Sequence, residues 1–97
     1  IAPEEVEQVL MSHPAIDEAA IIGIPDVEWG ERVRAIVVKK PGAEVTGGEL
    51  IEHCRPPMAG FKRPEDVVFV DQLPRNPMGK VLKRVLRDVH SHPIQSH

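Results

Sequence analysis

The chain has 97 residues, of which 41% are hydrophobic and 28% charged, and its net charge is −3. That is the length of one small domain and the composition of a folded protein, so an intrinsically disordered chain is excluded. The sequence has a single cysteine, Cys54, which excludes an intrachain disulfide. It also lacks the apolar run of about 18 residues that a transmembrane helix needs. We therefore expect a cytoplasmic protein with no transmembrane segment.

The two halves of the chain differ in charge. Residues 1–54 carry 4 basic and 11 acidic side chains, a balance of −7, whereas residues 55–97 carry 8 basic and 4 acidic ones, a balance of +4. A basic half can meet a nucleotide, a nucleic acid or an acidic partner. Aromatic residues make up only 3% of the chain and tyrosine is absent. The sequence therefore offers no platform for stacking bases, and we expect no nucleic-acid partner.

Three elements are predicted in the first half of the chain. A proline followed by two glutamates at residues 3–5 predicts the start of a helix over 3–12, which the proline at position 14 ends. Short apolar segments at 16–24 and 32–40, rich in isoleucine and valine, predict two strands. The connection between them is too long for a two-residue hairpin turn.

The remaining elements follow after a Pro-Gly turn. Thr46 and Glu49 have the spacing of a capping box, which predicts a helix through Cys54. The run DVVFVD over 66–71 predicts a third strand. Residues 79–90 place their apolar side chains on one face and their basic ones on the other, which predicts an amphipathic helix.

The predicted order is therefore α-β-β-α-β-α. This is an α+β domain with a small three-stranded sheet flanked by helices. The last seven residues, 91–97, show no hydrophobic period, and we expect them to form a disordered tail after a domain over residues 1–90.

The segment LPRNPMGK, residues 73–80, ends in a lysine that follows a glycine. A phosphate-binding P-loop is excluded, since that motif requires glycine at the position of Pro74 and a hydroxyl at that of Val81. A lysine here suits a mobile negative charge, such as a carboxylate that approaches a phosphate. Taken alone, however, this segment favours an ordinary solvated lysine at position 80.

A wider pattern bears on this choice. The segments IAPEEVEQVLMSHPAIDEAAIIGIPDVEWGERVRAIVV, ELIEHCR and MAGFKRPEDVVFVDQLPRNPMGKVLKRVLR occur in this order. Together they closely resemble the C-terminal domain of adenylate-forming enzymes, the superfamily of acyl-CoA synthetases, peptide-synthetase adenylation domains and luciferases. The resemblance extends from residue 1 to about residue 88 and is strongest to acyl- and aryl-CoA ligases.

The resemblance implies a role for Lys80, because PRNPMGK corresponds to the P-x-x-x-x-G-K segment of the family. Lys80 would contact the substrate carboxylate and the α-phosphate of ATP during acyl-adenylate formation. The implied partners are a small carboxylic acid, coenzyme A, and ATP with Mg, which is bound mainly by a large N-terminal adenylation domain. The chain would begin just after the hinge to that domain, and we expect this mobile C-terminal domain to be inactive by itself.

The resemblance also implies a surface for coenzyme A. The segments EWGE and FKRPE look like those that border coenzyme A in CoA-forming members, so Trp29, Phe61 and Arg63 are candidate contacts. Glu65 stands where a second basic residue would add a phosphate contact. Each candidate has a structural alternative: Trp29 can cap the sheet, Phe61 can belong to the core, and Arg63 can be a solvated loop charge.

The sequence is also compatible with two functions other than that of a CoA ligase. The chain could belong to an adenylation domain that loads a carrier protein, or it could be a regulatory or interaction module of α+β fold without a catalytic role. Cys54 lies on the apolar side of its predicted helix, which favours a buried, inert thiol. Three histidines near the C-terminus lack the ligand spacing of a metal site, and no metal residues are predicted.

Overall fold

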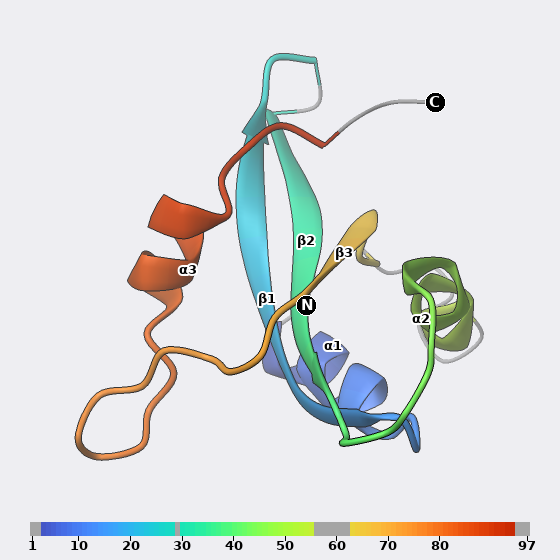
Figure 1. The fold of residues 1–97 in the computed structure, drawn as a ribbon. Coiled ribbons are helices and arrows are strands. Elements are labelled where there is room, and N and C mark those ends of the chain that lie inside the picture. Colours follow the sequence, from blue (N-terminus) through green and yellow to red (C-terminus); the bar gives the residue numbers. More distant parts are fainter. Residues whose placement is uncertain (1–2, 29, 56–62, 95–97) are drawn as a thin grey trace.

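The computed structural model describes residues 3–28, 30–55 and 63–94. Its elements, in chain order, are α1 (Pro3–Met11), β1 (Ile16–Asp26), β2 (Gly30–Lys39), α2 (Gly47–Cys54), β3 (Asp66–Phe69) and α3 (Lys83–Val89). Figure 1 shows α3 set apart from α1 and α2 by the three strands. This is the α+β fold, with the element order α-β-β-α-β-α, that the sequence predicts. No described helix is long and apolar enough to cross a membrane.

The sheet is mixed and has the strand order β1-β2-β3. β1 and β2 pair antiparallel from Ile16 and Lys39 to Asp26 and Gly30. β2 and β3 run parallel, with Arg34 opposite Asp66, and α2 lies within the crossover that such a parallel pair requires. β1 and β3 are therefore the two edges of the sheet.

The connection between the first two strands is shorter than predicted. Both strands extend beyond their expected ends, so only residues 27–29 join them, and residue 29 lies outside the described residues. Asp26 pairs with Gly30 at the end of the ladder, and the Asp26 carboxylate accepts a hydrogen bond of 2.8 Å from the backbone N–H of Glu28. The connection is thus a tight hairpin rather than a long loop.

Two apolar layers cover the two faces of the sheet. One joins the sheet to α1 and α2, and its buried side chains are those of Val6, Leu10, Ile16, Ala19, Ile21, Val33, Ala35, Val37, Val45, Leu50 and Cys54. The other lies beneath α3 and consists of Ala20, Ile22, Ile24, Ile36, Val38, Leu73, Leu86 and Ile94. Because β1 and β2 are buried on both faces, their sequences are nearly continuous in apolar residues rather than strictly alternating.

The predicted capping box opens α2 as expected. The Thr46 hydroxyl accepts a hydrogen bond of 3.1 Å from the backbone N–H of Glu49, which satisfies one of the free donors of the first turn. The helix ends at Cys54, whose side chain is buried against the sheet.

The last helix begins four residues later than predicted. The sequence pattern indicated a helix over 79–90, whereas α3 is Lys83–Val89. Gly79 has a φ of 87°, which a right-handed helix does not allow, and Leu82 donates its N–H to the carbonyl of Pro74 at 2.8 Å. Contacts within the preceding loop therefore override the helical period, and Lys80 lies in that loop rather than on α3.

The chain after α3 is held by a buried arginine. Arg34 is 1% exposed, and its guanidinium forms two hydrogen bonds of 2.8 Å to the Asp66 carboxylate and donates to the carbonyls of His90 and His92 at 2.7 Å. Ile94 is buried in the α3 layer. The His92 carbonyl and the Ile94 side chain therefore attach part of the expected tail to the domain, and residues 95–97 lie outside the described part of the chain.

Candidate functional site

Lys80 lies in a compact loop between β3 and α3, shown in orange in Figure 1. The side-chain oxygen of Asn76 accepts hydrogen bonds from the backbone N–H groups of Met78 and Lys80, both at 2.9 Å. The N–H of Asn76 in turn donates to the Lys80 carbonyl at 2.9 Å. Both backbone polar groups of Lys80 are thus bonded to one residue, and its Cα has a fixed place within the loop.

Arg75 makes further contacts within the same loop. It forms an antiparallel bridge with Val81 and donates from its guanidinium to the carbonyl of Gly79 at 2.6 Å. The guanidinium also forms an ion pair with Glu18 on β1. The loop carrying Lys80 is therefore a hairpin-like structure held by several hydrogen bonds of its own.

The ammonium group of Lys80 is directed to solvent. The residue is exposed, and in the described part of the chain no hydrogen bond or ion pair engages its side chain. It lines an open hollow of about 410 Å³ together with Asn76, Val81, Leu82, Lys83 and Arg84. A free cation at the rim of a basic, open hollow can meet an anionic ligand presented from outside this domain.

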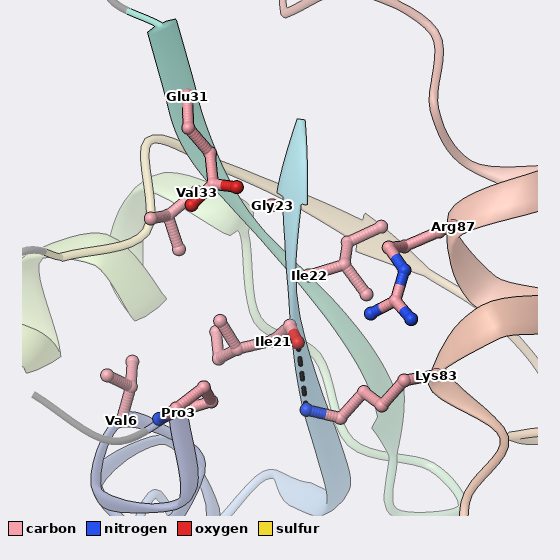
Figure 2. A pocket seen from close by; sticks show the side chains of 9 residues that line it. All are labelled: Pro3, Val6, Ile21, Ile22, Gly23, Glu31, Val33, Lys83 and Arg87. Carbon is pink, nitrogen blue, oxygen red and sulfur yellow. Dashed lines mark hydrogen bonds between the residues drawn. The ribbon is translucent and has the colours of Figure 1, made fainter. Parts of the chain in front are cut away.

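Lys83, expected on the solvated face of the last helix, has a defined partner instead. Its ammonium lies 2.6 Å from the Glu7 carboxylate of α1 and donates to the carbonyl of Ile21 on β1 at 2.9 Å. Figure 2 shows this side chain reaching from α3 to the edge of the sheet. The same carboxylate accepts from the N–H of Ile21 at 2.7 Å. Lys83 thus links the start of α3 to α1 and β1.

The candidate coenzyme A contacts are only partly described. Trp29 and Phe61 lie outside the described residues, and Arg63 is half-buried shortly before β3. Arg63 does not line the hollow that contains Lys80, and in Figure 1 the start of β3 lies across the sheet from the orange loop. Glu65 binds β2 through Arg32, at 3.0 Å, and through the N–H of Val33, at 3.2 Å, which explains an acid at that position.

Other reactive side chains have structural surroundings. Burial raises the pKa of the Cys54 thiol, and the positive charge of Arg63 offsets part of that effect. This favours the inert, protonated thiol that the sequence indicates. The described residues contain no cluster of three or more His, Cys, Asp or Glu side chains able to hold a metal ion.

The sequence matches the family described as AMP-binding enzyme C-terminal domain over residues 5–80. The chain belongs to this family. The matched range contains all of the first apolar layer and most of the second, and it ends at Lys80, so the family assignment covers the loop described above. It also confirms the resemblance to adenylate-forming enzymes.

Two relatives illustrate how close this C-terminal domain is to known enzymes. It is 46% identical over 88 residues to a fatty acid–acyl-carrier-protein ligase, ScoC, of Streptomyces coeruleorubidus, which covers 91% of this chain and 17% of the relative. It is 43% identical over 94 residues to the long-chain-fatty-acid–CoA ligase FadD13 of Mycobacterium tuberculosis, which covers 97% and 18%. The chain thus spans less than a fifth of the length of these relatives.

Solved structures agree with the fold. The crystal structure of apo MatB from Rhodopseudomonas palustris superposes with a TM-score of 0.89 at 40% identity, covering 95% of this chain and 18% of that one. The α+β arrangement described above is therefore the arrangement of this family.

Neither Arg75 nor Asn76 was singled out from the sequence as part of the site, although both shape the loop. Asparagine before proline in a short loop is a known turn signal and could have identified Asn76. The partners of Arg75 and Lys83 lie on β1 and α1, far away in the sequence, so no local pattern indicates them.

Proposed function

We propose that this chain is the mobile C-terminal domain, over residues 1–90, of an ATP-dependent acyl- or aryl-CoA synthetase. In this proposal Lys80 is the catalytic residue that assists acyl-adenylate formation. The proposal rests on an exposed Lys80 whose side chain has no bonded partner among the described residues, on a hydrogen-bonded loop, within a chain of the AMP-binding enzyme C-terminal family.

The chemistry of adenylation explains why such a lysine is useful. A carboxylate must attack a phosphate that carries charge of the same sign. One ammonium placed near both groups reduces their repulsion and stabilises the charge that develops on the phosphate oxygens. Because the Lys80 backbone is held by Asn76 while its side chain is free, the cation has a long reach from a fixed base.

The remaining components of the reaction are divided between this domain and the rest of the protein. ATP, with its Mg ion, and the carboxylic acid would be bound mainly by the protein's own N-terminal adenylation domain. Coenzyme A would contact this domain at Trp29, Phe61 and Arg63, of which Arg63 can pair with a phosphate. We place the enzyme in the cytoplasm, in keeping with a lone, buried cysteine. The isolated chain should not catalyse the overall reaction.

A second candidate acceptor is a carrier protein. The relative from Streptomyces coeruleorubidus is named as a ligase for an acyl-carrier protein, which supports this alternative. If the full-length protein makes acyl-adenylate but never acyl-CoA when coenzyme A is supplied, the synthetase proposal fails and the carrier-protein alternative gains support.

Replacing Lys80 by alanine in the full-length protein tests the proposal. The rate of acyl-adenylate formation should fall about 100-fold or more, the range seen when one charge-stabilising group is removed from an active site. Lys40→Ala is the matched control, since Lys40 is also exposed and, among the described residues, its side chain has no bonded partner. A non-catalytic regulatory module would show the same adenylation rate for both variants.

A further inference from the structure

The hydrogen bonds around Lys80 fix it within its own loop but not relative to the rest of the domain. Asn76 and Arg75 belong to the same loop as Lys80, so their contacts with its backbone move with it. Besides the apolar packing of Val81 on the α3 layer, two ion pairs of the described residues leave the loop, one near each end. Arg75 pairs with Glu18 before Lys80, and Lys83 pairs with Glu7 after it.

Both anchors reach β1, which is an edge strand of the sheet. Glu18 is a residue of β1, and Lys83 donates to the carbonyl of Ile21 on the same strand. Figure 2 shows the Lys83 side chain crossing from α3 to that carbonyl. Since Glu7 accepts from the N–H of Ile21, the Glu7–Lys83 pair satisfies the outward backbone groups of Ile21 much as a neighbouring strand would.

The anchors are more shielded from water than a typical surface pair. The side chains of Arg75 and Glu18 in the first anchor are 41% and 28% exposed, and those of Glu7 and Lys83 in the second are 13% and 30% exposed. By contrast, the Arg55–Glu52 pair on α2 is 56% and 65% exposed. Partly buried pairs are screened less by solvent and salt, so the two anchors hold geometry more firmly than Arg55 and Glu52 do.

We propose that Arg75 and Lys83 are positioning residues for Lys80: each ties one end of its loop to β1. The inference rests on the proposed function, because it takes Lys80 as the adenylating lysine. The anchors touch no reactant themselves. They set where the Lys80 ammonium can lie relative to the sheet, and a misplacement of about 1 Å at a reacting group can cost about 100-fold in rate.

The test uses the full-length protein and measures its two half-reactions separately. One assay follows acyl-adenylate formation from ATP and the acid, and the other follows transfer of the acyl group from preformed acyl-adenylate to coenzyme A. Arg75→Met and Lys83→Met remove one anchor each, and Lys83→Arg keeps a cation and donors at the second anchor. Arg55→Met removes the exposed pair on α2 and serves as the matched control.

Loss of either anchor should lower kcat for adenylation about tenfold, with KM for ATP and the transfer reaction within about twofold of wild type, because only transition-state positioning is impaired. Lys83→Arg should recover most of the rate, and Arg55→Met should resemble wild type. Glu18→Gln is nearly isosteric and loosens the first anchor without altering packing, so it gives the same information if Arg75→Met does not fold.

Lys80→Ala in the same assays separates the two proposals. If Lys80→Ala leaves adenylation intact, the proposed function itself fails. If Lys80→Ala lowers adenylation but the anchor variants behave like Arg55→Met, the positioning role is overturned. An equal loss in both half-reactions, or no recovery with Lys83→Arg, also overturns it, because either result indicates a general structural effect.

Discussion

Replacing Arg34 by methionine should strongly destabilise this domain. The guanidinium is 1% exposed and makes four hydrogen bonds of 2.7 to 2.8 Å, two to the Asp66 carboxylate and one each to the carbonyls of His90 and His92. Methionine can fill the space but donates no hydrogen bond. The variant therefore leaves a carboxylate and two carbonyls without their donor.

The expected loss in the free energy of unfolding can be estimated from these contacts. Removing one partner of a buried ion pair costs about 3 to 5 kcal/mol. Asp66 is 32% exposed, so water can solvate part of its charge, which places the loss near 3 kcal/mol, at the lower end of that range. For a domain of this length, such a loss lowers the melting temperature by at least about 12 °C.

Urea and thermal unfolding of the 97-residue chain measure this loss, with Arg55→Met as control. Arg55 and Glu52 form an exposed pair, so that variant should lose less than about 1 kcal/mol. Arg34→Met combined with Asp66→Asn should recover part of the stability, since the uncompensated charge is removed. If the free energy of unfolding of Arg34→Met lies within about 1 kcal/mol of the wild-type value, as expected for Arg55→Met, the buried arginine is not a main source of this domain's stability.

Three further changes test other parts of the structure. Thr46→Ala removes the cap of α2 and should lower the free energy of unfolding by about 1 kcal/mol in urea titrations. Gly79→Ala places a side chain at a φ of 87°, which costs about 1 to 2 kcal/mol, and it should slow acyl-adenylate formation in the full-length protein while leaving acyl transfer unchanged. Burial lowers the pKa of His90, with help from the charges of His92 and Arg34, so the unfolded chain binds a proton more readily there. Stability should therefore be complete above pH 6.5 and fall as the pH drops below it toward the lowered pKa, and His90→Asn should reduce that slope in unfolding measured across pH.

The sequence predicted the order of elements because local signals mark most of their ends. Thr46 and Glu49 opened α2 as expected. Pro25 was misleading, because proline usually ends a strand, whereas here it lies inside β1. An edge strand tolerates proline where the missing N–H faces away from its partner. Whether proline ends a strand thus depends on the strand's place in the sheet, which a local sequence pattern does not indicate.

The start of α3 and the surroundings of Lys80 depend on contacts between distant residues. The helical period continued back through Val81, but the bridge between Arg75 and Val81 keeps this segment extended. Lys80 itself could be identified from its motif. The contact of Lys83 with Ile21 joins residues 62 positions apart, and only the folded arrangement brings them together. The sequence therefore identified the candidate catalytic residue but not the contacts that hold its loop.

The most direct test of the account compares acyl-adenylate formation and acyl transfer in one variant, Lys80→Ala of the full-length protein. Adenylate formation should fall about 100-fold or more. Transfer from preformed acyl-adenylate to coenzyme A should keep most of its rate, and Lys40→Ala should be normal in both reactions. A Lys80→Ala enzyme that forms acyl-adenylate at the wild-type rate would contradict the account.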